Sequence, residues 1–303
     1  MTTTTPNTSE TTETPRADEP LLVVEDLAVE YESAGAVPWR RKVSRAIDGV
    51  SFEIFPGETL GLVGESGSGK STTGRAILRL NDAAAGSIRF QGTEVTTLGR
   101  RTPLSYRRDV QAIFQDPNSS LNPRHVVGRC VDDTLRTHGV TDPGERRARA
   151  EQAFDQVGLS TDHMHRFPAE LSGGQQQRVA IARALVLEPK LVVCDEAVSA
   201  LDLSTQGQII NLLADLQAIT GVSYLFIAHD LGIVRHISDR IAVMQRGHLV
   251  EIGEAEELFT NPQHPYTRKL LGASPAAKPE GRDERRARRE AFRQIHEAET
   301  QLA

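Results

Sequence analysis

The glycine-rich stretch at residues 64–71 constrains the fold of this chain more than any other feature. It reads Gly-Glu-Ser-Gly-Ser-Gly-Lys-Ser, between an apolar run at residues 59–63 and a segment at residues 72–80 that is typical of a helix. Glycines let successive backbone N–H groups turn inward around an anion, and the following helix adds the positive end of its dipole. A strand, such a loop and a helix in this order predict an α/β fold with a phosphate-binding P-loop.

The side chains at the end of this loop suit a nucleoside triphosphate with its magnesium ion. Lys70 supplies a full positive charge at the β- and γ-phosphates, and Ser71 offers a hydroxyl to Mg²⁺. A chance match to this pattern in a chain of 303 residues is about a one-in-a-hundred event. The residues expected to surround the phosphates are Gly64, Glu65, Ser66, Gly67, Ser68, Gly69, Lys70, Ser71 and Thr72.

The composition is that of an ordinary globular protein. Hydrophobic residues make up 38% of the chain and charged residues 25%. The sequence contains no run of about 18 apolar residues, which is the length needed to span a membrane. The net charge of −6 argues against nucleic acid as the main partner. Cys130 and Cys194 are too few for an iron–sulfur cluster or a structural zinc site, so we expect free thiols. Residues 1–19 are rich in Thr and acidic residues, which predicts a disordered tail rather than a signal peptide.

The pattern along the chain predicts an α/β core interrupted by a helical insertion. The first third combines antiparallel strands with the P-loop unit, residues 98–188 are mainly helical, and an α/β pattern returns afterwards. The polar insert at residues 32–45, which carries Trp39, is expected to be a surface loop of a hairpin. The expected strands are 21–31, 46–55, 59–63, 86–92, 109–114, 190–195, 222–228, 240–245 and 248–252, and the expected helices are 72–80, 143–157, 173–187, 203–220 and 230–236.

Two carboxylates, Asp195 and Glu196, follow the apolar run at residues 191–194. An acidic pair at the end of a core strand would face the P-loop at the carboxyl edge of the sheet, where ligands bind. Asp195 suits the coordination shell of Mg²⁺, and Glu196 suits a general base that takes a proton from the water attacking the γ-phosphate. Many strands end in an acid, so the pair carries weight only because a P-loop precedes it.

A third motif, Leu-Ser-Gly-Gly-Gln-Gln-Gln-Arg at residues 171–178, resembles the signature of the ATP-binding cassette ATPases. This motif is also suited to bind an anion, because its serine and glycines lie at a helix N-terminus. The resemblance implies a RecA-like P-loop NTPase core with an antiparallel β subdomain and a helical insertion subdomain. The order along the chain is also that of the family: P-loop, Gln115, signature, Asp195 and Glu196, Asp202, then His229.

The resemblance implies catalytic and binding roles for further side chains. Gln115 matches the Q-loop residue, which senses the γ-phosphate or Mg²⁺ and links the helical insertion to the core. His229 matches the switch histidine, which contacts the γ-phosphate and holds Glu196 in place. Tyr31 is the candidate for stacking on adenine, although Trp39 offers a second aromatic ring.

In the family that the chain resembles, the signature and the P-loop act in trans. Two cassettes close head to tail, and Asp202 matches the D-loop that crosses to the other subunit. One cassette in the chain therefore implies a partner cassette. The signature residues that would contact ATP bound to Lys70 of that partner are Ser172, Gly173, Gly174 and Gln175.

The end of the chain resembles one branch of the family. The segment Asn-Pro-Gln-His-Pro-Tyr-Thr-Arg-Lys-Leu-Leu at residues 261–271 is similar to the ATPase subunits of oligopeptide and dipeptide importers. The expected organisation is a cassette at residues 20–275, with a helical subdomain at 98–188 and a peptide-importer-type segment at 254–275, followed by a charged tail at 276–303.

The partners implied by this resemblance are two membrane permeases, an extracytoplasmic substrate-binding protein that acts indirectly, and a second ATPase. That ATPase is a different cassette or a second copy of this chain, and the location is the cytoplasmic face of the cell membrane. An exporter or lipoprotein-release ATPase shares every catalytic motif, and nickel or another small solute remains a possible cargo. A cassette ATPase acting on DNA or ribosomes is disfavoured because the chain has neither a second cassette nor a long coiled coil. A non-catalytic cassette is disfavoured because all the catalytic motifs are present.

Overall fold

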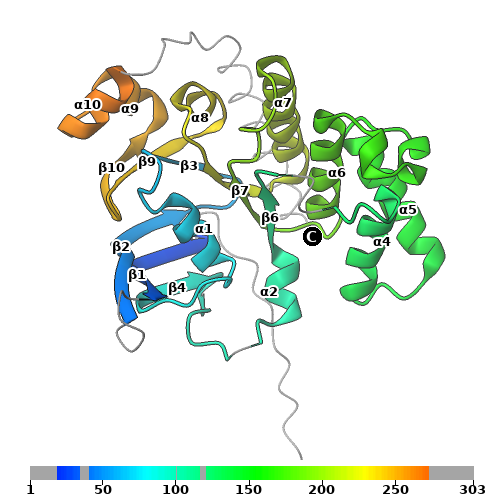
Figure 1. Cartoon of the computed structure of the whole chain (residues 1–303), viewed down its shortest axis with the longest axis horizontal. Coiled ribbons are helices and arrows are strands. Elements are labelled where there is room, and N and C mark those ends of the chain that lie inside the picture. Colours follow the sequence, from blue (N-terminus) through cyan, green and yellow to red (C-terminus); the bar gives the residue numbers. More distant parts are fainter. Residues whose placement is uncertain (1–18, 35–40, 100, 117–120, 273–303) are drawn as a thin grey trace, which may run out of the picture.

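A computed structural model describes residues 19–34, 41–99, 101–116 and 121–272. The expectations for the tails at residues 1–18 and 276–303 and for Trp39 lie outside these residues. The described chain forms two β-sheets with helices around them, and a helical lobe lies to one side (Figure 1). None of the helices in the described ranges is long and apolar enough to cross a membrane.

The larger sheet has six strands in the order β10-β9-β3-β8-β7-β6. The strands β9, β3, β8, β7 and β6 run parallel to their neighbours, and β10 pairs antiparallel with β9. Every residue of β3, β7 and β8 is buried, which explains their continuous apolar sequence. The bounds are β3 Thr59–Val63, β6 Val110–Phe114, β7 Leu191–Asp195, β8 Ser223–Ile227, β9 Arg240–Gln245 and β10 His248–Glu254.

The pairing register brings the ends of three strands to one edge of this sheet. Ile227 at the end of β8 pairs with Leu62 of β3 on one side and with Asp195 of β7 on the other. Because these strands are parallel, the loops that follow them leave from the same edge. The P-loop, the acidic pair and the segment that carries His229 therefore begin side by side.

The smaller sheet is antiparallel, with the order β2-β1-β4-β5. Pairing between β1 and β2 continues to Ala34 and Arg41, so both strands extend into the insert predicted as a loop at residues 32–45. The helix α1 lies beside this sheet (Figure 1). The bounds are β1 Leu22–Ala34, β2 Arg41–Ile54, β4 Ala85–Phe90, β5 Thr93–Glu94 and α1 Lys70–Ile77.

The two faces of the parallel sheet belong to two hydrophobic cores. Successive side chains on a strand point to opposite faces, and in β7 Val193 joins the core shared with α1 and the antiparallel sheet. Its neighbours Val192 and Cys194 join the core on the other face, which includes Ile209 of α7 and Val234 of α8. The helices are α7 Leu203–Thr220 and α8 Leu231–Ile237. The buried strand β7 thus contributes side chains to both hydrophobic cores.

The helical lobe stands beyond β6, on the side of the molecule away from the antiparallel sheet (Figure 1). It contains α4 Val127–Thr137, α5 Pro143–Gln156, η1 Thr161–His165, η2 Pro168–Glu170 and α6 Gly173–Leu185. The helix α2, Leu104–Asp109, lies inside the range 98–188 but packs elsewhere, since the Tyr106 ring meets Phe90 of β4 edge to face. After β10, the short helices α9 Ala255–Thr260 and α10 Pro265–Gly272 complete the described chain.

A substitution at Phe154 of α5 tests how the core of the helical lobe is packed. This side chain is fully buried, whereas Phe167 in the same lobe is 43% exposed. Phe154→Ala should lower the free energy of unfolding by about 3–5 kcal/mol, because it leaves a cavity in the core. The control, Phe167→Ala, should change it by about 0.5 kcal/mol or less. Urea unfolding followed by circular dichroism measures both, and equal losses would contradict this assignment of the lobe core.

Candidate nucleotide-binding site

The side chain of Lys70 is folded back into the loop that precedes it. Its Nζ donates hydrogen bonds to the carbonyl oxygens of Gly64, at 2.8 Å, and of Glu65, at 3.0 Å. Burial lowers the pKa of the Lys70 ammonium, while the carboxylates of Glu196 and Asp195 act in the opposite direction. The structure therefore places a buried positive charge inside the glycine loop and within the field of the acidic pair.

The loop needs glycine at its first position and before Lys70. Gly64 has a φ of 154°, and a Cβ there would lie 2.2 Å from the carbonyl oxygen of Met244. Gly69 has a φ of 108°, and a Cβ there would lie 2.5 Å from the Ile47 side chain. The Ser68 hydroxyl is buried without a hydrogen-bond partner among the described residues. A cradle of this shape, with an unused hydroxyl, fits an oxyanion such as phosphate.

Ser71 and Asp195 meet directly across the edge of the sheet. The Ser71 hydroxyl, in the first turn of α1, donates a hydrogen bond of 2.7 Å to the Asp195 carboxylate at the end of β7. No group of three or more His, Cys, Asp or Glu among the described residues could hold a metal alone. Mg²⁺ is usually bound through one or two carboxylates together with substrate phosphates. The oxygen donors of Ser71 and Asp195 therefore fit a magnesium ion that arrives with a nucleotide.

The residue Glu196 has a left-handed backbone, with a φ of 52°. Such a conformation costs a residue other than glycine about 1–3 kcal/mol and persists only where neighbouring groups impose it. The Glu196 N–H donates to the Ile227 carbonyl at 3.0 Å, and its carbonyl accepts from the Ser199 N–H at 3.1 Å. The backbone at the end of β7 thus turns sharply beside the end of β8.

His229 and Gln115 follow the strands on either side of β7. His229 is exposed in the segment after β8, and Gln115 is exposed directly after β6. Phe114, the last residue of β6, pairs with Asp195. Both side chains therefore start from the edge that carries Lys70 and the acidic pair, while their contacts with a nucleotide remain predictions.

The signature forms the beginning of α6, where Ser172 is the N-cap. Its Oγ accepts the Gln175 N–H at 3.3 Å, and the Gln175 side chain accepts the Ser172 N–H at 3.0 Å. This capping box leaves Ser172 and Gly173 exposed. No hydrogen bond between described residues joins the signature to the P-loop. The signature therefore presents its helix end to solvent.

Asp202 has the same kind of position at the start of α7. Its carboxylate accepts the Thr205 N–H at 3.0 Å and the Ser204 hydroxyl at 2.7 Å. These hydrogen bonds, the one from the Ser204 side chain foremost, lower the pKa of Asp202 to about 2. In this structure the residue acts as a helix cap, and its predicted contact with another subunit is untested.

Tyr31 lies beside the first turn of α1. Its hydroxyl is 3.2 Å from Thr72 Oγ1 and accepts a hydrogen bond of 2.7 Å from the Asn81 side chain. The side chain is 41% exposed. An accessible ring next to the P-loop helix is compatible with stacking on a base, and that role stays a prediction.

Sequence reasoning missed Tyr266, whose hydroxyl accepts the N–H of Glu65 in the P-loop at 3.0 Å. Tyr266 lies in the segment that resembles peptide importers, but nothing in its local pattern indicates this contact. Sequence reasoning also missed the turn between β9 and β10, where the Gly247 N–H donates to the Ser68 carbonyl at 3.0 Å. The P-loop is therefore supported by two chain segments that are distant in sequence, since Tyr266 lies 201 residues after Glu65 and Gly247 lies 179 residues after Ser68 (247 − 68).

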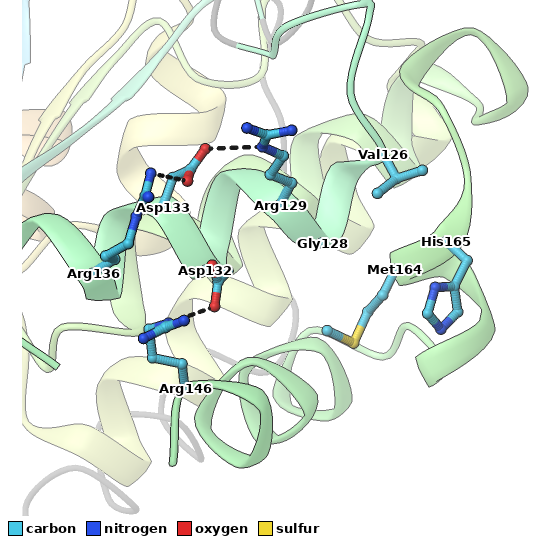
Figure 2. Close-up of a pocket in the computed structure, with 9 residues that line it drawn as sticks. All are labelled: Val126, Gly128, Arg129, Asp132, Asp133, Arg136, Arg146, Met164 and His165. Carbon is cyan, nitrogen blue, oxygen red and sulfur yellow. Dashed lines mark hydrogen bonds and ion pairs between the residues drawn. The ribbon is translucent and has the colours of Figure 1, made fainter. Parts of the chain in front are cut away.

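The helical lobe contains a hollow of about 430 Å³ between α4 and the segment around Met164 and His165 (Figure 2). The charges on its wall pair with one another. Arg146 bonds to Asp132 at 2.6 Å, and Asp133 bonds to Arg136 at 2.7 Å and to Arg129 at 3.5 Å (Figure 2). These guanidinium groups already have carboxylate partners, so the hollow is less suited to phosphates than the P-loop is.

Comparison with known proteins bears on this site. The model of the ABC transporter family matches residues 47–199, which include the P-loop, the signature and the acidic pair. The model of the oligopeptide/dipeptide transporter C-terminal region matches residues 250–300.

Curated relatives agree with these matches. The glutathione import ATP-binding protein GsiA of Escherichia coli is 52% identical over 262 residues, and that of Shigella flexneri is 51% identical. The match covers 86% of this chain but 42% of either relative, so the chain spans about two fifths of their length.

Solved structures resemble the described fold. The ATP-binding cassette MJ0796 bound to ADP and Pi is 29% identical, with a TM-score of 0.68, and the match covers 77% of this chain and 98% of that one. The cbiO1 subunit from Clostridium perfringens is 28% identical, with a TM-score of 0.69, and the match covers 80% and 92% of the two chains. The predicted fold and family are thereby confirmed. The chain belongs to the ABC transporter family, and its residues 250–300 resemble the C-terminal region of oligopeptide/dipeptide transporters.

Proposed function

We propose that this chain binds and hydrolyses ATP as the motor subunit of a membrane importer that takes up oligopeptides or dipeptides. The observation that carries the ATPase part is the Ser71–Asp195 contact of 2.7 Å beside the buried Lys70 ammonium. This contact brings two oxygen donors for Mg²⁺, those of Ser71 and Asp195, next to the loop that would hold the phosphates. The match of residues 250–300 to the oligopeptide/dipeptide region supports the cargo class.

The site residues divide the work of hydrolysis. Lys70 and the N–H groups of the P-loop hold the phosphates, while Ser71 and Asp195, with Gln115, would hold Mg²⁺. The bound ion supplies positive charge that offsets the charge on the phosphates. Glu196 takes the proton of the attacking water, and His229 keeps Glu196 in position.

The arrangement of the signature supports the action of two cassettes together. Ser172 and Gly173 are exposed at the start of α6, and no hydrogen bond in the described part of the chain links them to the P-loop. A second cassette brings such a helix end to the phosphates held by Lys70. That cassette is a different ATPase or a second copy of this chain. ATP favours the closed pair and hydrolysis reopens it, so nucleotide drives a two-state switch.

The remaining partners follow from the family. Two permeases form the path through the membrane, an extracytoplasmic binding protein delivers the cargo, and the chain sits on the cytoplasmic face of the membrane. Glutathione, the import substrate named for GsiA, is a small peptide-like solute and fits the same cargo class. The oligopeptide/dipeptide match favours this proposal over an exporter or lipoprotein-release ATPase and over a nickel importer. Nucleic acid has no part in it.

Transport by the assembled complex tests the proposal. The chain is tagged in its host, purified from membranes with its permeases and partner ATPase, and placed in vesicles with the binding protein. We expect ATP-dependent uptake of radiolabelled dipeptides, oligopeptides or glutathione, and no uptake with a non-hydrolysable ATP analogue. Uptake of nickel without any peptide, or export alone, would contradict the cargo class.

The catalytic base is tested by Glu196→Gln in the same complex. The amide keeps the size of the side chain but does not take up a proton, so turnover should fall about 10²- to 10⁴-fold while ATP binding is retained. Phosphate release measures turnover, and a fluorescent ATP analogue measures binding. Glu151→Gln on α5, where Glu151 pairs with Arg147 at 2.8 Å, is the control and should hydrolyse ATP normally. Near-normal hydrolysis by Glu196→Gln would sink the assignment.

The magnesium ligands are tested by Ser71→Ala. Loss of this hydroxyl should raise the Mg²⁺ concentration for half-maximal ATPase activity by roughly 10-fold or more, since partners of metal ligands alone contribute 10- to 100-fold. A magnesium titration at saturating ATP checks this. Ser87→Ala in β4, away from the P-loop, should leave the titration curve where it is. An unchanged curve for Ser71→Ala would remove Ser71 from the metal site.

A further inference from the structure

The helix α10, the last helix of the described chain, contacts the P-loop through the side chain of Tyr266. We propose that Tyr266 is a positioning residue for nucleotide binding: its hydroxyl orients the peptide unit between Gly64 and Glu65, and that unit places the Lys70 ammonium. The proposal rests on the ATPase function proposed above. It also gives a role to the His-Pro-Tyr-Thr segment at residues 264–267, which has no role in the hydrolysis scheme described above.

The geometry turns on the two ends of one peptide unit. The N–H of Glu65 donates to the Tyr266 hydroxyl at 3.0 Å. The carbonyl of Gly64, in the same unit, accepts a hydrogen bond from Lys70 Nζ at 2.8 Å. A peptide unit is planar and its N–H and C=O point in opposite directions, so a partner on one side fixes the direction of the other. Tyr266 thereby sets where the Gly64 carbonyl points.

The ammonium of Lys70 depends on that direction. Its second bond goes to the Glu65 carbonyl at 3.0 Å, which begins the next peptide unit. An ammonium has three donors, and two carbonyls occupy two of them, which leaves one for a phosphate oxygen. A charged group held in place before it meets its ligand binds more tightly, because less freedom is lost on binding. The Tyr266 hydroxyl thus contributes to affinity without touching the nucleotide.

Tyr266 is itself held firmly. The side chain is 6% exposed, and its backbone N–H donates to His264 Nδ1 at 3.2 Å. The Glu251 carboxylate of β10 accepts the N–H groups of Gln263 at 2.8 Å and of His264 at 3.0 Å. The start of α10 is therefore attached to β10, the edge strand of the six-stranded sheet. The phenol reaches the P-loop from a fixed base rather than from a loose tail.

The helix before α10, which is α9, is attached to α8. Arg235 of α8 bonds to Glu256 of α9 at 3.0 Å, and its guanidinium lies over the Phe259 ring at 5.0 Å from the centroid. The helix α8 follows the segment that carries His229. The C-terminal segment thus contacts both the P-loop and the helix behind the switch histidine, and Tyr266 is its point of contact with the phosphate cradle.

The test is Tyr266→Phe in the full chain, which removes one oxygen and keeps the ring. The matched control is Tyr224→Phe in β8, because Tyr224 is also buried and its hydroxyl also donates to a backbone group, the Leu213 carbonyl, at 3.2 Å. Affinity for a fluorescent ATP analogue with Mg²⁺ and the melting temperature are measured for both. Tyr266→Phe should weaken nucleotide binding by about 2- to 12-fold, the range expected for one neutral hydrogen bond. Tyr224→Phe should lower the melting temperature by about as much as Tyr266→Phe does, and it should leave the nucleotide affinity unchanged.

A second measurement separates positioning from general support. In a Lys70→Ala background, Tyr266→Phe should change nucleotide affinity by less than about twofold, because the group that it positions is gone. A full effect in that background, or equal losses of affinity in Tyr266→Phe and Tyr224→Phe, would overturn the proposal. So would wild-type affinity in Tyr266→Phe. Failure of the unaltered chain to bind ATP is a different result, and it would overturn the ATPase function itself.

Discussion

Parallel pairing of β3, β8 and β7 is the constraint on which the site depends. Ile227 of β8 faces Leu62 on one side and Asp195 on the other, so three loops with different chemistry begin within two strand spacings of each other. The Ser71–Asp195 hydrogen bond closes this arrangement across the edge. A slip in register would move the acidic pair away from the P-loop, and no local feature of either motif could restore the contact.

The parts of the site that sequence reasoning found are those whose chemistry is local. The P-loop carries its glycines, its lysine and its helix within residues 64–77, and Asp195 is the last residue of its own buried strand. Tyr266 could not be found in this way, because it meets Glu65 across 201 positions of the chain. Its hydroxyl is a partner only after β10 and α10 have docked, and short-range patterns carry no information about docking.

The fold was predictable to a similar degree. Apolar runs identified the buried strands, since a parallel strand covered on both faces has no alternation to confuse the pattern. The lengths of β1 and β2 and the place of α2 were less accessible. Pairing continues to Ala34 and Arg41 through polar sequence, and α2 takes its place from the contact of Tyr106 with Phe90 of the antiparallel sheet. The first depends on pairing between the two strands of one hairpin and the second on packing of a helix against the antiparallel sheet, and the local pattern indicates neither.

The two-sided burial of β7 has a consequence for Cys194. This thiol is fully enclosed, and burial raises its pKa well above the ordinary value, with the charge of Asp195 acting in the same direction. A thiol in that state is protonated and shielded, so reagents that are attacked by thiolates do not modify it in the folded chain. Only an opening of the central sheet would expose it. The rate at which a thiol reagent modifies Cys194 therefore reports how often the strand that carries Asp195 opens.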